Sequence, residues 1–183
     1  KRLQNDKKIL IAACNSFGYS LKFLKKTKNK LYNDIRINKA AVSQYGFSLQ
    51  YVSKKLRDNP KVVLKAVEQN GYSLKYASLR LRNDKNFVLK CVKKNGYALL
   101  YASNFLKKDR KIVLTAIKNY PYSLEYVSKK IKNFKDIILF AVKLNCYNLQ
   151  YVDKKFFLDK EILNVALAQD RYILKFLNLE ANN

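Results

Sequence analysis

Aromatic and apolar residues recur along this chain with a period of 25 residues. An aromatic residue opens each unit, a leucine follows two positions later, and a second aromatic residue follows four positions later. The first interval is 28 residues, because three residues are inserted near positions 29–32. The opening aromatic residues are Tyr19, Phe47, Tyr72, Tyr97, Tyr122, Tyr147 and Tyr172. A fixed period of this length predicts tandem copies of one supersecondary unit.

The first helix of a unit is illustrated by residues 83–95. A wide helical arc is covered by its apolar residues Phe87, Val88, Leu89, Cys91 and Val92. The remaining strip is filled by Lys90, Lys93 and Lys94. Asp84 is the expected N-cap, because its carboxylate can accept from free backbone N–H groups. The residues at the equivalent place are Asp6, Asp34, Asp109 and Asp159, and Asp58 lies one position earlier. Asp136 is also assigned to a helix start. Gly96 is expected to end the helix in a left-handed conformation. Pro121 occupies the same place and cannot adopt positive φ, so it predicts a different turn there.

The second helix is expected to run from about Ser73 to Arg82. Its apolar residues Leu74, Ala77 and Leu81 are three and four positions apart, which places them on one helical face. Ser73 is the expected N-cap, and the equivalent residues are Ser20, Ser48, Ser123 and Asn148.

Helices of about ten residues are not stable alone in water, so the units must stack to bury their apolar arcs. We therefore expect an all-α protein, an α-solenoid of about seven 25-residue helix-turn-helix repeats with right-handed superhelical stacking. Residues 1–183 are expected to form a single domain. Residues 1–18 fit the second part of a unit, which predicts that the chain is a fragment of a longer array.

A known family shares this pattern. Residues 58–82, DNPKVVLKAVEQNGYSLKYASLRLR, resemble the tandem repeats of the domain of unknown function 4116 family. The resemblance covers nearly the whole chain through the V-V-L-x-A-V helix, the Asn-Gly turn and the Tyr-Ala-Ser that follows. It implies an α-helical repeat and supplies no catalytic residues. Because the family includes secreted effectors, it also suggests an effector that acts inside a host cell.

Composition argues against an enzyme and in favour of an anionic partner. The chain has 38 Lys and Arg residues, 13 Asp and Glu residues and no His, which gives a net charge of +25. Without His the commonest general base is missing, and the closest carboxylate pair, Asp159 and Glu161, is interpreted as a charged first turn. We expect no cofactor, no metal and no membrane-spanning segment. The expected free core thiols, which indicate a reducing intracellular compartment, are Cys14, Cys91 and Cys146.

Basic residues recur in phase with the repeat, at the end of each second helix. Stacked units would align them as a ladder along one edge. The candidate anion-binding residues are Lys54, Lys55, Arg57, Arg80, Arg82, Lys107, Lys108, Lys129, Lys130, Lys132, Lys154 and Lys155. The alternative is a solvated edge whose cations complement helix dipoles. That alternative explains one lysine per helix better than two or three.

The second aromatic residue of each unit also has two interpretations. On a helical wheel, Tyr51, Tyr76, Tyr126 and Tyr151 lie near the basic residue four positions later, an arrangement that suits stacked bases and phosphates of single-stranded nucleic acid. The alternative, favoured by recurrence in every unit including Phe23 and Phe176, is packing against the adjacent repeat.

Two partners remain open. The first is nucleic acid, bound through its backbone without sequence preference. The second is an acidic protein surface, with the array acting as an interaction scaffold. Docking to an anionic membrane is a weaker third interpretation, because the charge is spread along the array.

Overall fold

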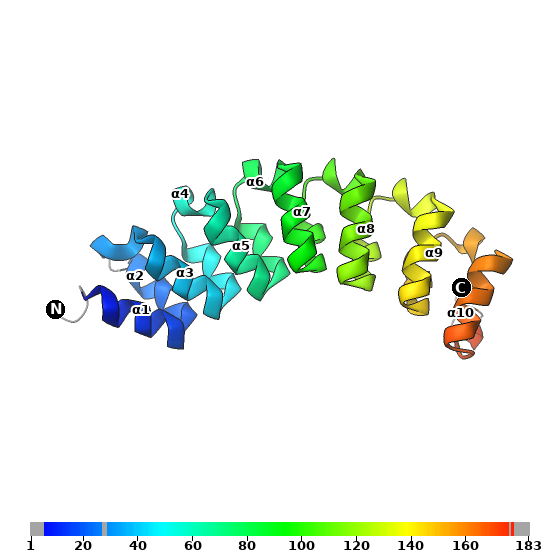
Figure 1. Ribbon diagram of the computed structural model, residues 1–183, viewed down its shortest axis with the longest axis horizontal. Helices are drawn as coiled ribbons and strands as arrows, with labels where there is room; N and C mark the ends of the chain where they lie inside the picture. Colours follow the sequence, from blue (N-terminus) through cyan, green and yellow to red (C-terminus); the bar gives the residue numbers. More distant parts are fainter. Residues whose placement is uncertain (1–5, 27–28, 176, 178–183) are drawn as a thin grey trace.

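The computed structural model describes residues 6–26, 29–175 and 177, and these residues form helices and turns without any strand. The helices lie in a row along the long axis of the molecule, in sequence order (Figure 1). In this described part of the chain, six successive units each contain a long α-helix, a 3-10 helix and a short helical segment, and a seventh long helix follows them. The predicted all-helical fold with repeated segments is therefore confirmed.

The long helices form one layer. Each has ten residues and contacts the long helix of the next unit. Their bounds are Lys7–Ser16 (α1), Ile35–Gln44 (α3), Pro60–Gln69 (α5), Lys85–Lys94 (α7), Arg110–Asn119 (α8), Lys135–Leu144 (α9) and Lys160–Gln169 (α10).

The 3-10 helices form a second layer and also contact one another in succession. Their bounds are Gly18–Ser20 (η2), Gly46–Tyr51 (η4), Gly71–Tyr76 (η5), Gly96–Tyr101 (η6), Pro121–Tyr126 (η8) and Cys146–Tyr151 (η10). In the first unit, η2 leads directly into α2, Leu21–Lys26.

The short segments follow the 3-10 helices and precede the next long helix. They are Lys30–Asn33 (η3), Lys54–Arg57 (α4), Leu79–Asn83 (α6), Leu106–Lys108 (η7), Ile131–Asn133 (η9) and Lys154–Phe156 (η11). The segment η3 contains part of the three-residue insertion of the first unit.

The prediction of one continuous second helix over Ser73–Arg82 is wrong. The backbone is extended at Ala77, with φ −67° and ψ 159°, and it separates η5 from α6. The Ser78 N–H donates to the Arg57 carbonyl of the preceding unit at 3.0 Å, so it does not continue a helix. Even so, Leu74, Ala77 and Leu81 are all buried, so the expected apolar positions are correct.

The expected N-caps of the second helix are also wrong. Ser48, Ser73, Ser123 and Asn148 are buried inside 3-10 helices, and Ser20 ends one. The hydroxyl of Ser48, for example, donates to the Gly18 carbonyl of the preceding unit at 2.8 Å. The residue before each 3-10 helix is often the cap, since its side-chain oxygen accepts from the amide two positions later. Three such caps are Asn70, Asn95 and Asn145. Asp170, after the last long helix, accepts from the Tyr172 amide in the same way.

The caps of the long helices largely match the prediction. Side-chain oxygens accept from first-turn amides at Asp6, Asp34, Asp84, Asp109 and Asp159. Two units differ. Asn59 rather than Asp58 caps α5, and Phe134 precedes α9 with Asp136 in its first turn.

The glycine turns were predicted with the wrong mechanism. The four glycines are Gly18, Gly46, Gly71 and Gly96, and none of them has a left-handed φ. Instead, the backbone lies against the next unit: a Cβ on Gly46 would be 2.6 Å from the Ala66 carbonyl oxygen. Because this turn needs no positive φ, Pro121 can adopt it, and the prediction of a different turn there is wrong. The preceding Tyr120 has φ −143° and ψ 101°, close to the −153° and 117° of Asn70.

The core lies between the two layers and is divided into two clusters. One cluster of buried residues extends from Cys14 to Ala141, and a second joins α9 to Leu177. Cys14, Cys91 and Cys146 are buried free thiols, as predicted. Burial raises the pKa of all three, that of Cys91 to about 12, so these thiols behave as apolar core groups.

Candidate anion-binding edge

The short segments lie along one edge of the row, and α4 and α6 mark it in Figure 1. Main-chain hydrogen bonds join successive segments. Ser103 N–H donates to the Arg82 carbonyl at 3.1 Å, and Ser128 N–H donates to the Lys107 carbonyl at 3.4 Å. With the bond from Ser78 described above, these contacts place the segments side by side. We call this feature the basic edge, because its segments carry most of the twelve candidate residues.

Most of the candidate cations on the basic edge are open to solvent. The exposed ones are Lys54, Lys55, Arg80, Lys108, Lys129, Lys130, Lys154 and Lys155. Arg80 is nevertheless bound within the protein, since its Nε lies 3.0 Å from the Asp58 carboxylate. Asp58 also accepts from the Ser78 hydroxyl, and both contacts lower the pKa of its carboxyl group. Arg80 is therefore less available to a ligand than the sequence suggested.

The remaining candidates form an inner column of half-buried cations, which sequence reasoning did not separate from the others. They are Arg57, Arg82, Lys107 and Lys132, one in each of four successive units. Arg82 Nε donates to the Tyr101 carbonyl of the next unit at 2.8 Å. Tyr32, in the same column, makes the equivalent bond to the Tyr51 carbonyl. Burial lowers the pKa of Lys107, and the neighbouring Arg82 lowers it further.

Acidic residues border the basic edge but have their own partners. A basic residue at or near the start of one long helix pairs with an acidic residue at the start of the next. The pairs are Lys7 with Asp34, Lys85 with Asp109 at 2.6 Å, Arg110 with Asp136, and Lys135 with Asp159 at 2.8 Å. These cations are outside the set of twelve candidate residues. The acidic residues of these pairs therefore do not neutralise the candidate cations of the basic edge. In three of the four pairs the basic residue directly follows a capping aspartate, which is a sequence signal that we did not use, and Lys135 instead follows Phe134.

The basic edge is interrupted by two exposed apolar side chains. Leu79 is 70% exposed and occupies the repeat position of Lys54 and Lys129. Phe105 is 78% exposed and occupies the position of Lys55 and Lys130. The middle of the edge therefore offers apolar contact between cationic ends.

The aromatic residues form a ladder between the 3-10 helices. In each case the opening aromatic residue of one unit contacts the second aromatic residue of the next. The centroid distances are 5.3 Å for Tyr19–Tyr51, 6.3 Å for Phe47–Tyr76, 6.1 Å for Tyr72–Tyr101 and 6.4 Å for both Tyr97–Tyr126 and Tyr122–Tyr151. The second aromatic residues of the five units from Tyr51 to Tyr151 are half-buried against the core, which confirms the packing interpretation for them. Phe23, the equivalent residue of the first unit, is 62% exposed, so the interpretation is wrong there. Phe176 lies outside the described residues.

The predicted pairing of each second aromatic residue with the basic residue four positions later is wrong, because the break after each 3-10 helix interrupts the helical spacing. Cations from other positions approach two of the rings. Lys75 Nζ lies 6.0 Å from the centroid of Tyr101, and Lys132 Nζ lies 5.9 Å from that of Tyr151.

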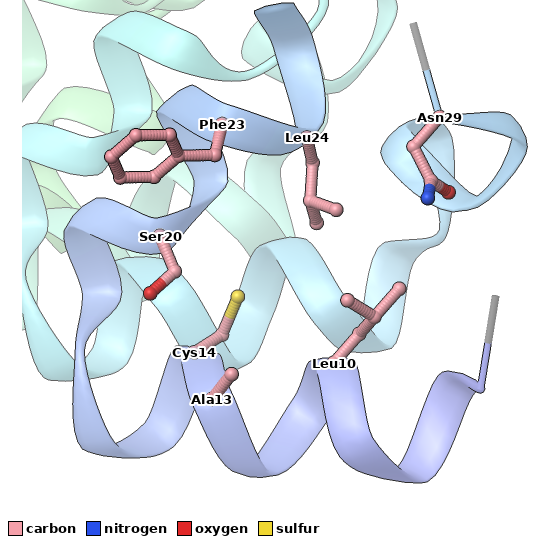
Figure 2. Close-up of a pocket in the computed structure, with 7 residues that line it drawn as sticks. All are labelled: Leu10, Ala13, Cys14, Ser20, Phe23, Leu24 and Asn29. Atoms are coloured by element: carbon pink, nitrogen blue, oxygen red, sulfur yellow. The ribbon is translucent and has the colours of Figure 1, made fainter. Parts of the chain in front are cut away.

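A separate apolar pocket lies near the first described helix. Figure 2 shows Leu10, Cys14, Phe23 and Leu24 around it, and its volume is about 200 Å³. The polar residues of its lining are Ser20 and Asn29. Burial raises the pKa of the Cys14 thiol, which disfavours the nucleophilic thiolate.

Two further expectations concern metals and membranes. Within residues 6–26, 29–175 and 177, no group of three potential metal ligands comes together. Across the same residues, no helix is both long and apolar enough to cross a membrane.

Asp159 and Glu161 belong to the cap and first turn of α10 and both bind Lys135, as the first-turn interpretation expects.

These features define a class of all-helical proteins with tandem units and a cation-rich edge. The family model described as domain of unknown function (DUF4116) matches residues 34–82, 59–104, 84–132 and 135–180. The chain belongs to this family. The first three matches begin 25 residues apart, in register with the repeat. No curated protein and no solved structure matches the chain.

Proposed function

We propose that this chain is a non-catalytic α-solenoid of about seven units that binds a polyanionic partner, the backbone of nucleic acid, along its basic edge. The contacts between successive long helices and between successive 3-10 helices support the solenoid arrangement. The net charge of +25 supports attraction to a strongly anionic polymer.

The observation that carries this proposal is the main-chain linkage of the short segments. Because Ser78, Ser103 and Ser128 bond to the preceding segment, cations one repeat apart are held in a row rather than scattered. A row of lysines and arginines suits a polymer with one phosphate per nucleotide. Binding releases condensed counterions, so affinity should fall steeply with salt.

Fluorescence anisotropy with mixed-sequence single-stranded and double-stranded oligonucleotides, measured over a salt series, tests the proposal. Glutamine substitutions remove four charges from the basic edge, at Lys54, Lys55, Lys129 and Lys130. A matched control removes four exposed charges from the long helices, at Lys61, Lys90, Lys111 and Lys143. We expect the edge variant to reduce the slope of log affinity against log salt by about three, since each lost phosphate contact removes about 0.7 to 0.9.

The control variant should retain most of the wild-type slope. Two results would overturn the proposal. One is undetectable binding of the wild-type chain at low salt, and the other is an equal loss of slope in both variants, which would indicate an unspecific charge effect.

An acidic protein partner is the alternative, and the exposed Phe105 and Leu79 favour it. Protein interfaces depend on a few buried anchors, among which aromatic residues are common. Phe105 and Lys130 occupy the same repeat position, so their alanine variants form a matched pair. A protein partner, isolated by crosslinking, should lose more affinity with Phe105→Ala than with Lys130→Ala. The reverse order favours nucleic acid.

A reducing intracellular compartment, including the interior of a host cell, fits this proposal. The three free cysteines are buried, and raised pKa values make them poor nucleophiles.

A further inference from the structure

A pocket of about 360 Å³ opens in the basic edge where η9 meets the following unit. It is lined by Lys129, Lys132, Asn133, Tyr151 and Asp153. Its volume is at the lower end of the range for small-ligand sites. Four of these five side chains can donate a hydrogen bond, so donors predominate in the lining of the pocket.

Lys132 is the half-buried member of the inner column at this pocket. Its Nζ donates to the Glu125 carbonyl at 2.9 Å, which uses one of its three N–H bonds and leaves two for a ligand. Burial lowers the pKa of Lys132, Glu125 raises it, and the neighbouring Lys129 lowers it. The ammonium groups of Lys129 and Lys132 repel each other, and Lys132 is partly shielded from water. An anion that binds between them would stabilise both charges.

The equivalent junction three units earlier supplies its own anion. There Asp58 occupies the place of Asn133, and its carboxylate accepts from Ser78 and Arg80. Asn133 carries no charge, so it cannot perform that role beside Lys129 and Lys132. At this pocket the carboxylate is that of Asp153, which stands at the repeat position of Ser78, so the two junctions place their acidic group differently.

Asp153 is the one acidic residue that lines the pocket, and it opposes an anionic ligand. Its Oδ1 accepts from the Lys155 N–H at 3.1 Å, as a cap of η11. The formal charge of the lining is +1, from Lys129, Lys132 and Asp153. An asparagine at position 153 would keep the cap and remove the opposing charge.

We infer that this pocket binds one phosphate of a nucleic-acid strand, with the Lys129 and Lys132 ammonium groups donating to its oxygens. The Asn133 amide and the Tyr151 hydroxyl supply the remaining donors. This inference rests on the proposed function and adds one preferred contact to an otherwise sequence-independent edge.

The test compares two pairs of charge-matched variants with a 12-nucleotide single-stranded DNA of mixed sequence. Lys129→Gln with Lys132→Gln should weaken binding about tenfold more than Lys54→Gln with Lys55→Gln, because charge-assisted bonds in a pocket exceed screened surface attraction. Asp153→Asn should strengthen binding about threefold, and Asp6→Asn, a distant cap, should leave it nearly unchanged. Glutamine keeps hydrogen-bond donors at each substituted position, and thermal melts verify folding of every variant.

The outcomes separate the two proposals. If the wild-type chain does not bind the strand, the proposed function fails and the pocket fails with it. If it binds and the two lysine pairs weaken it equally, or Asp153→Asn has no more effect than Asp6→Asn, only the pocket is overturned. A larger loss at Lys129 and Lys132 with a gain at Asp153 supports it.

Discussion

Single residues at the turn between the long helix and the 3-10 helix set how closely two units approach. The Gly46 N–H donates to Gln69 Oε1 of the next unit at 2.6 Å, and the Gly96 N–H donates to Asn119 Oδ1 at the same distance. Pro121 has no N–H to donate, and Leu144 occupies the facing position. That unit therefore has neither the N–H donor nor the side-chain acceptor. Neither group is left buried without its hydrogen-bond partner.

A methyl group at Gly46 should disturb this contact. A Cβ there would meet the Ala66 carbonyl, the Ser73 hydroxyl and the Gln69 amide at 2.6 to 2.7 Å, distances that require the next unit to move. We expect Gly46→Ala to reduce the free energy of unfolding by about 1 to 3 kcal/mol, as overpacking does. Urea denaturation followed by circular dichroism measures it. Ser43→Ala, at an exposed site on α3, is the control, and an equal effect of both substitutions would contradict the expectation.

The glycine position also marks a limit of prediction from sequence at this scale. The sequence identified the turn, because Gly or a substitute follows each long helix. It did not identify the reason, because left-handed backbone and close approach both favour a residue without Cβ. Aspartate caps were predictable because the cap and the amides it binds are neighbours in the chain.

At the scale of elements, the long helix could be predicted and the second helix could not. The wide apolar arc of residues 87–92 indicates a helix regardless of its surroundings. The break at Ala77 depends on the carbonyl of Arg57, which lies 21 positions before the amide of Ser78 that it binds. A pattern confined to one segment cannot report a hydrogen bond that the preceding unit provides. The four-residue spacing between aromatic and basic residues failed for the same reason.

The row of ion pairs at the long-helix starts should make stability depend on pH. Burial alone would raise the pKa of Asp34 and Asp109, but the lysine partners Lys7 and Lys85 and the first-turn amides together lower it by more. Lys135 lowers the pKa of Asp159. With folded-state values below the ordinary 3.8, the folded protein binds fewer protons than the unfolded chain in the acid range. This contribution to stability is therefore complete above about pH 5 and is lost as the pH falls through those lowered values.

Thermal unfolding at pH 6 and pH 3 measures this contribution. We expect the melting temperature of the wild-type chain to fall further than that of a variant with asparagine at positions 34, 109 and 159, since asparagine keeps the caps without the charge. Equal falls would mean that repulsion among the 38 basic residues, rather than the ion pairs, controls acid stability.

At the scale of the whole molecule, each long helix contacts the long helices of adjacent units. The period in the sequence predicted this arrangement of neighbours, because units that cannot bury their apolar faces alone must stack. It also predicted the alignment of the cations, since equal spacing in a regular stack gives rows. It did not predict the division into exposed and half-buried cations, which depends on where each short segment turns.

If stability is a sum of units and their interfaces, one whole period should be removable. Deletion of residues 84–108 joins Asn83 to Asp109, so the cap of the next long helix is preserved. We expect a folded, shorter protein with unchanged helical signal per residue by circular dichroism and a lower melting temperature. Deletion of residues 84–95 alone, which breaks the period, should prevent cooperative unfolding. A shorter protein that unfolds when one full period is removed would contradict the stacking argument.

The amide-to-carbonyl bonds between successive short segments have a consequence for evolution of the surface. These main-chain bonds fix the distance between neighbouring segments. Substitutions of exposed side chains can therefore change the chemistry of the surface without changing the spacing between the substituted positions. Leu79, Phe105 and Lys129 occupy nearby positions on the same scaffold despite their different chemistry. Such an array can acquire a new ligand preference one unit at a time while its pitch stays constant.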